Sequence, residues 1–259
     1  MKQTVFLAAS WKRLAMANYT IDPRVLEPFL PAGTELDFFH DQCYVSLVGF
    51  LFDDVRVKGW TIPWHRRFPE VNLRFYVKQG DKRGVVFISE LVPKPAISWV
   101  ANTLYREHYA CLPMKYDWKE GGTSLETRYA WKKKGQWQSL TVHTGKETVP
   151  IAAGSVEEFI TEHYWGYTRW NERTTGAYQV AHPRWNMYPV QKYNIECDFG
   201  MMYGLAFSAL TGQAPASVLL AEGSAIEVYG GARFKVSATE DRQVSATADR
   251  QVHYSQFQK

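Results

Sequence analysis

The chain has 259 residues, of which 46% are hydrophobic and 22% are charged, and its net charge is +4. This balance is typical of a globular domain large enough to bury its own core, and the charge is too small to predict a nucleic-acid partner. No apolar run reaches the ~18 residues of a membrane span and no secretory leader is evident, so we expect no membrane contact. The three cysteines are widely spaced, which favours the reducing cytoplasm over a disulfide framework.

The predicted elements are mainly strands, with a few isolated helices. Helices are predicted where a capping residue precedes an apolar i, i+3, i+4 stripe: at Asp22, near Pro95 and at Ser155. Strands are predicted from alternating or continuously apolar runs at 43–52, 68–77, 85–91, 125–132, 187–196 and 217–229. This order, without regular strand–helix alternation, indicates an α+β domain built on antiparallel sheet.

The most informative strand is 68–77, whose sequence FPEVNLRFYV alternates without a break. One face is apolar, and the other carries Glu70, Asn72, Arg74 and Tyr76. A half-exposed strand with its polar face in water has this pattern, and so does a strand that lines a closed barrel holding one small molecule. A carboxylate and a guanidinium on one face can pair inside such a cavity, and arginine can bind both oxygens of a ligand carboxylate.

Two other segments contain candidate site residues. Met114 and Lys115 end the segment YREHYACLPMK in an apolar neighbourhood, where a desolvated lysine would lose proton affinity and become an amine nucleophile. An exposed lysine at the start of a strand is the alternative. His182 and Trp185 lie in the stretch HPRW, where a histidine beside an aromatic ring can line a pocket, transfer a proton or complete a loop.

Metal and cofactor motifs are not found in the sequence. The histidines are scattered, and two neighbouring ligands such as His108 and Cys111 are fewer than a metal site needs. Dinucleotide- and phosphate-binding motifs are missing as well. We therefore predict neither a metal nor a cofactor.

The C-terminal segment differs from the rest of the chain. Residues 236–243 (VSATEDRQ) and 244–251 (VSATADRQ) are a tandem repeat with one substitution, and two copies are too few for a solenoid. We predict one domain over residues 1–235, followed by a tail over 236–259 that is mobile or pairs as an extra hairpin.

Four blocks of the sequence carry a family resemblance. They are YTIDPRVLEPFLPAGTELD from residue 19, the 68–77 strand, YREHYACLPMK from residue 105 and HPRW from residue 182. In these blocks the chain resembles the uncharacterised YqjF-like family of the acetoacetate decarboxylase-like superfamily, over about residues 11–234. The resemblance implies a twisted antiparallel sheet curled into a cone or barrel, with a few helices outside and a pocket within.

The resemblance also implies which catalytic groups this chain retains. The decarboxylases use a Schiff-base lysine whose pKa a second lysine lowers, in a run similar to R-E-x-x-x-x-P-K-K. Here Arg106 and Pro113 match, but Met114 stands at the bonding position and Lys115 at the second. Glu70 matches a glutamate of the decarboxylase strand. The missing nucleophile argues against acetoacetate decarboxylase activity.

These observations predict a small-molecule-binding protein whose ligand is anionic or carbonyl-bearing. The predicted contacts are Glu70, Asn72, Arg74, Tyr76, Met114, His182 and Trp185. The alternatives are a lyase of decarboxylase, aldolase or dehydratase type that acts on a keto acid through Lys115 or Glu70, and a structural or partner-binding protein. The superfamily implies oligomers, but the residues contain no interface signal. The sequence therefore allows a homo-oligomer without predicting one.

Overall fold

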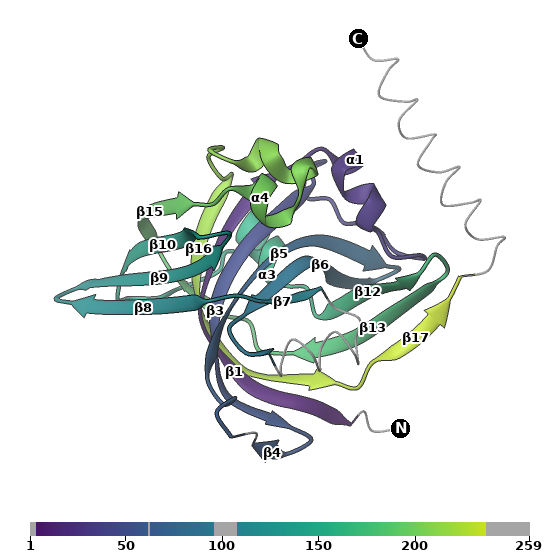
Figure 1. Cartoon of the computed structure of the whole chain (residues 1–259), viewed down its shortest axis with the longest axis horizontal. Coiled ribbons are helices and arrows are strands. Elements are labelled where there is room, and N and C mark those ends of the chain that lie inside the picture. The colour runs from purple at the N-terminus through teal and green to yellow at the C-terminus, as the bar shows by residue number, and fades with distance from the viewer. Residues whose placement is uncertain (1–3, 62, 96–107, 237–259) are drawn as a thin grey trace, which may run out of the picture.

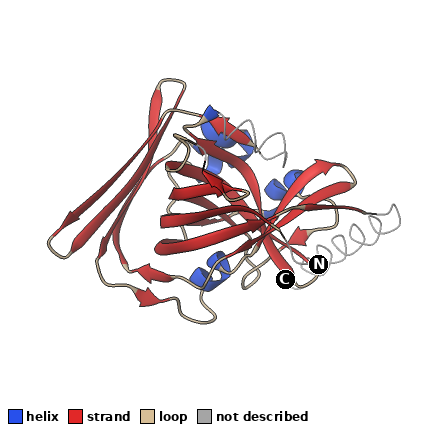
Figure 2. Cartoon of the chain, turned by 90° about the horizontal axis from the view of Figure 1, so that it is seen from below, coloured by secondary structure: helices blue, strands red, loops and turns tan. Residues whose placement is uncertain are grey.

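The computed structural model of the chain describes residues 4–61, 63–95 and 108–236. Strands make up most of these residues, and the few helices are short (Figures 1 and 2). The predicted helix near Pro95 and the repeat tail beyond Val236 lie outside the described residues. Within the described ranges, no helix is both long and apolar enough to cross a lipid bilayer.

The main sheet contains 13 strands within the described residues. They are, in chain order, β1 (Val5–Thr20), β2 (Glu35–Leu36), β3 (Tyr44–Val57), β4 (Trp60–Thr61), β5 (Phe68–Gln79), β6 (Lys82–Val92), β7 (Tyr109–Cys111), β11 (Val149–Pro150), β12 (Trp165–Asn171), β13 (Thr174–Ala181), β14 (Asn186–Tyr188), β16 (Ser217–Tyr229) and β17 (Ala232–Lys235). Hydrogen-bonded neighbours follow the order β11-β14-β16-β1-β3-β5-β6-β12-β13-β17.

This sheet closes on itself. A further pairing joins β13 to β16, with Val180 opposite Val228, so the path β16-β1-β3-β5-β6-β12-β13 returns to its start. The pairs along this path are antiparallel except for β6 and β12, which pair in parallel through Gly84 opposite Trp165 and through the next residue of each strand. The closed path gives each strand an inner and an outer face.

A second sheet lies beside the first (Figure 1). Its strands, in the order β15-β10-β9-β8, are β8 (Met114–Gly121), β9 (Ser124–Lys133), β10 (Gln136–Gly145) and β15 (Val190–Glu196). Tyr129 of β9 approaches β3 so closely that a Cβ at Gly49 would lie 2.8 Å from the tyrosine ring. Glycine at this position therefore lets the two sheets pack together.

The helices within the described residues are short. They are α1 (Pro23–Leu26), η1 (Glu27–Phe29), α3 (Val156–Thr161), α4 (Phe199–Tyr203) and η2 (Leu205–Leu210). Of these, α1 and α4 pack outside the cone. Asp22 and Ser155 cap α1 and α3 as predicted, because each side chain accepts a hydrogen bond from a backbone N–H in the first turn.

Two hydrophobic clusters share the faces of the main sheet. The outer core lies between the main sheet, the second sheet and the helices α1 and α4, and it contains Val71, Leu73 and Phe75 of β5. The inner core lies within the cone and contains Phe68 and Tyr76 from the opposite face of β5. Both faces of this strand are covered, so the interpretation of a strand with its polar face in water is wrong.

The structure confirms the predicted α+β fold with a curled antiparallel sheet. The six predicted strands coincide with β3, β5, β6, β9, β14 with β15, and β16. The sequence analysis missed β1, β12 and β13, because their alternation of apolar and polar residues is irregular. Those three strands are the ones that complete the closed path.

The seam between β6 and β12 leads to the first prediction. A Cβ at Gly84 would lie 2.5 Å from the Trp165 carbonyl oxygen, so alanine there must push the two strands apart. We expect Gly84→Ala to lower the free energy of unfolding in urea by about 1–3 kcal/mol. The control is Gly121→Ala, whose Cβ would meet nothing within 4 Å. Equal stability of the two variants would contradict a tight seam.

Candidate functional site

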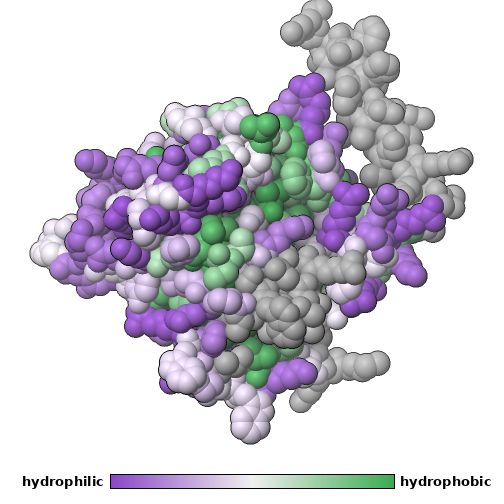
Figure 3. All heavy atoms as spheres, in the orientation of Figure 1, coloured by the Kyte–Doolittle hydropathy of each residue, from purple (hydrophilic) through white to green (hydrophobic). Residues whose placement is uncertain are grey.

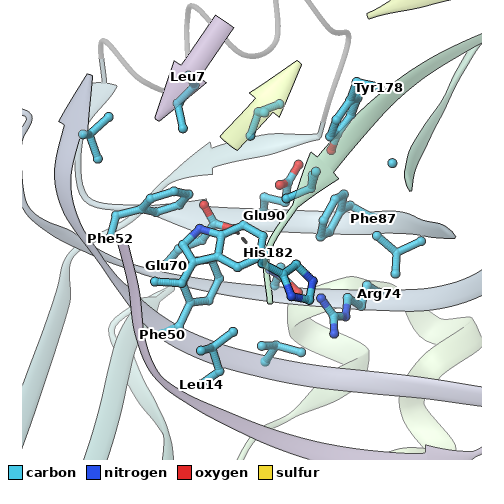
Figure 4. Close-up of a pocket in the computed structure, with 18 of the residues that line it drawn as sticks. Leu7, Leu14, Phe50, Phe52, Glu70, Arg74, Phe87, Glu90, Tyr178 and His182 are labelled. Carbon is cyan, nitrogen blue, oxygen red and sulfur yellow. Dashed lines mark hydrogen bonds between the residues drawn. The ribbon is translucent and has the colours of Figure 1, made fainter. Parts of the chain in front are cut away.

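The inner core surrounds a cavity of about 220 Å³ inside the cone (Figure 4). Its wall is made by alternate residues of the strands, which is the expected result when one face of each strand looks inward. On β3 these are Val48, Phe50 and Phe52, and aromatic and aliphatic side chains from β1, β6, β13 and β16 complete most of the surface. The cavity is thus largely apolar, with a small number of polar groups.

The polar row of β5 faces this cavity. Glu70, Asn72 and Arg74 all line it, and the first two are only 2% exposed. Figure 4 shows Glu70 and Arg74 projecting into the same space as His182. The β5–β6 pairing adds Glu90, which lies opposite Asn72 and is also 2% exposed. The cavity therefore contains two carboxylates and one guanidinium among its described lining residues.

Glu70 and Arg74 do not form the ion pair that the sequence allowed. Asn72 Nδ2 donates to Glu70 Oε1 at 3.1 Å, and the Tyr109 hydroxyl donates to Glu70 Oε2 at 3.2 Å. Arg74 Nη2 instead lies 3.5 Å from the carbonyl oxygen of Ile160. The physical reason is the strand rise, which separates residues four apart by ~13 Å.

A buried pair of residues that the sequence analysis missed lies next to Arg74. His163 lines the cavity, its side chain is 1% exposed, and its Nε2 is 3.0 Å from Asp37 Oδ2. Arg83 Nε donates to the same carboxylate oxygen at 2.7 Å. The His163 ring also stacks near Tyr76, with ring centroids 4.7 Å apart.

The charges of this pair follow from burial and from the neighbouring arginines. Burial lowers the pKa of His163 to about 4, and the charges of Arg83 and Arg74 act in the same direction against the Asp37 hydrogen bond. Burial raises the pKa of Asp37, but the hydrogen bonds from His163 and Arg83 outweigh it and keep that pKa below its ordinary value. At neutral pH an ionised Asp37 therefore faces a neutral imidazole.

His182 and Trp185 form another part of the cavity wall. Both line the cavity, and their rings stack at 4.1 Å with an interplanar angle of 15°. Burial lowers the pKa of His182, and the charge of Arg74 adds to this effect. The Trp185 indole N–H donates to the Ser224 hydroxyl at 2.8 Å, which holds the ring that supports His182.

Three of the predicted site residues do not line the cavity. Lys115 is the exposed lysine at the start of a strand, the alternative to a desolvated nucleophile, because β8 is an edge strand of the second sheet. Its side chain lies 4.9 Å from the Trp137 ring centroid. The surface over this sheet is largely hydrophilic (Figure 3). Met114 packs against the outer core, and the Tyr76 hydroxyl lies 2.6 Å from the Ser46 hydroxyl within the protein.

Several polar atoms of the cavity wall have no partner among the described residues. The buried atoms are Trp11 Nε1, Asn72 Oδ1, Arg74 Nε and His163 Nδ1. Buried polar atoms without hydrogen bonds are uncommon in folded proteins, and four of them surround one cavity here. These atoms are available to the polar groups of a bound molecule. Within the described part of the chain, no group of three His, Cys, Asp or Glu residues is arranged to hold a metal ion.

A closed antiparallel cone with helices outside and a cavity within is an acetoacetate decarboxylase-like fold. The solved structures that share this fold include the enduracididine biosynthesis enzyme MppR with HEPES buffer bound (TM-score 0.66, 12% identity, 91% of this chain and 89% of that chain). Another is acetoacetate decarboxylase from Legionella pneumophila (TM-score 0.59, 11% identity, 92% of this chain and 90% of that chain). At these identities the likeness concerns the fold.

The sequence comparison places the chain in a family. Residues 8–225 match DUF2071, described as an uncharacterized conserved protein, and the chain belongs to this family. A relative is the uncharacterized protein YqjF of Bacillus subtilis (strain 168), which is 25% identical over 193 residues, or 74% of this chain and 77% of that protein. The predicted YqjF-like family is therefore confirmed, and the solved structures confirm the predicted fold.

The neutral state of buried His163 predicts how stability depends on pH. The folded-state pKa of about 4 lies below the ordinary 6.5, so on acidification the unfolded chain binds a proton first and the fold loses stability. We expect this group to remove about 3 kcal/mol of unfolding free energy between pH 6.5 and pH 4. His163→Gln should flatten that part of the curve in urea unfolding measured at each pH.

The control for this experiment is His143→Gln, because the His143 side chain is 36% exposed and lies outside the cavity. It should keep the wild-type pH dependence. If His163→Gln and His143→Gln lose stability in parallel on acidification, His163 is not the buried neutral group.

Proposed function

We propose that the chain binds a small molecule bearing a carboxylate or a carbonyl group inside the cone. The observation that carries this proposal is the position of Arg74, a permanent cation on the wall of a largely apolar cavity. Arg74 has no ion-pair partner among the described residues, and its buried Nε has no hydrogen-bond partner there. A charge removed from water is costly unless an opposite charge or several hydrogen bonds compensate it. The guanidinium fork matches a carboxylate and supplies that compensation.

The size and lining of the cavity favour a compact ligand with an apolar part. The cavity has a volume of about 220 Å³, and aromatic rings such as Phe50, Phe52 and Phe87 line it, which favours an organic molecule over a hydrated ion. Low polarity around the site also strengthens each hydrogen bond that the few polar groups make. A single charged contact can therefore orient the ligand within the cavity.

Relatives with this fold are known with small acids bound. One solved structure of MppR, with a TM-score of 0.63 and 14% identity over 90% of this chain and 91% of that chain, is a complex with pyruvate. Pyruvate carries both a carboxylate and a ketone. This relative supports a carbonyl-bearing acid as the ligand class for the cavity of this chain.

Binding is favoured here over Schiff-base chemistry. No lysine lines the cavity among the described residues, and Lys115 lies on the second sheet. We expect borohydride treatment in the presence of pyruvate or acetoacetate to leave the intact mass of the protein unchanged. A stable adduct that maps to Lys115 would contradict the binding proposal and support the lyase alternative.

Substitution of Arg74 tests the proposed function. We expect Arg74→Ala to weaken binding of pyruvate and other short carboxylates by about tenfold to a hundredfold, because a charge-assisted hydrogen bond is lost. Isothermal titration and thermal-shift measurements provide the readout. Arg56→Ala is the matched control, since Arg56 is 51% exposed and pairs with Asp54 outside the cavity. Unchanged affinity of Arg74→Ala would overturn the assignment.

A further inference from the structure

Three polar side chains of the cavity wall, His163, His182 and Asn72, can accept a hydrogen bond from a ligand, whereas Arg74 can only donate one. An ionised Asp37 can only accept, so His163 Nε2 must carry the imidazole proton in their 3.0 Å hydrogen bond. The ring is neutral, which leaves a lone pair on Nδ1. This Nδ1 is buried and has no partner among the described residues. Asp37 thus fixes the tautomer in which His163 presents an acceptor.

His182 presents a second acceptor by the same reasoning. Its Nδ1 lies 2.9 Å from the Pro183 carbonyl oxygen, which only accepts, so the ring proton lies on Nδ1. A neutral ring then has its lone pair on Nε2. The stacked Trp185 ring holds this imidazole on the cavity wall.

Asn72 supplies a third acceptor. The Glu70 carboxylate accepts from Asn72 Nδ2 at 3.1 Å, and this orients the amide so that Oδ1 is its acceptor. Oδ1 is buried and has no partner among the described residues. Asn72 and Arg74 lie two residues apart on the same face of β5, at a Cα spacing of ~6.7 Å. The unpartnered groups of the wall are thus three acceptors and two donors, Arg74 and the Trp11 indole N–H.

We infer that the cavity selects hydroxy carboxylic acids: the carboxylate binds Arg74, and hydroxyl groups donate to His163 Nδ1, His182 Nε2 or Asn72 Oδ1. This inference rests on the proposed function and specifies its ligand class. A hydroxyl group can donate a hydrogen bond to these lone pairs. The ketone oxygen of a keto acid can accept from the Trp11 indole N–H, but it cannot donate and would leave the three lone pairs unpaired. An acid without the hydroxyl would leave the same acceptors unpaired, which costs binding free energy.

Pairs of acids that differ by one hydroxyl group test this inference. The probes are L-lactate against propionate and L-malate against succinate, with pyruvate as the ketone. Isothermal titration of the full-length protein should give at least about tenfold tighter binding for each hydroxy acid than for its partner and for pyruvate. Equal affinities within the pairs, or tighter binding of pyruvate, would overturn this inference and leave the proposed function in place. If none of the acids binds, both fail.

Two histidine variants test which residues distinguish a hydroxy acid from the acid without the hydroxyl group. His182→Phe keeps an aromatic ring that can stack on Trp185 but removes the acceptor, and His163→Phe removes the acceptor beside Asp37. Each should lower the affinity ratio of malate to succinate by about fivefold or more. His143→Phe, on the exposed second sheet, should keep the wild-type ratio.

Circular dichroism and the melting temperature show whether each variant folds. His163→Phe breaks a buried hydrogen bond and can prevent folding. In that case His182→Phe alone tests the role of the histidine acceptors. The role of the histidine acceptors is overturned in two cases, and in both a folded His182→Phe keeps the wild-type affinity ratio. In the first case His163→Phe also folds and keeps that ratio, and in the second case His163→Phe does not fold.

Discussion

Closure of the main sheet is the constraint on which the site depends. The pairing of β13 with β16 and the short parallel seam between β6 and β12 turn an open sheet into a cone. Only closure makes one face of β5 interior, because an open sheet would leave Glu70, Asn72 and Arg74 facing solvent. Gly84 matters for the same reason: its missing side chain lets the seam form.

An interior polar row has different physical properties from an exposed one. Each unpaired polar atom costs free energy in an apolar cavity, and each hydrogen bond there is stronger than in water. Some of these polar atoms are paired within the protein, because Asn72 and Tyr109 donate hydrogen bonds to Glu70. Burial also keeps His163 neutral beside an ionised Asp37. The result is a defined pattern of one cation and several acceptors, and that pattern is what a ligand must match.

The position of the lysine separates this chain from decarboxylases that share its fold. A Schiff-base enzyme needs an amine inside the cavity with a lowered pKa, and here Lys115 lies on an exposed edge strand of the second sheet. Met114, at the position that the resemblance gives to the bonding lysine, packs against the outer core. A fold does not determine the site built on it, so the shared cone leaves the chemistry of this cavity to its own side chains.

The sequence by itself determined the antiparallel α+β fold, six strand segments, two helix caps and the polar face of β5. Local periodicity and capping chemistry act over a few residues, so they can be read along the chain. Tertiary structure alone decided that this face is interior and that Lys115 lies on the other sheet. It also brought Asp37 and His163, 126 residues apart, to hydrogen-bonding distance. Glu90 gave a weak signal as an acid within an apolar strand, but His163 gave none, because long-range contacts form through closure of the sheet and leave no local pattern.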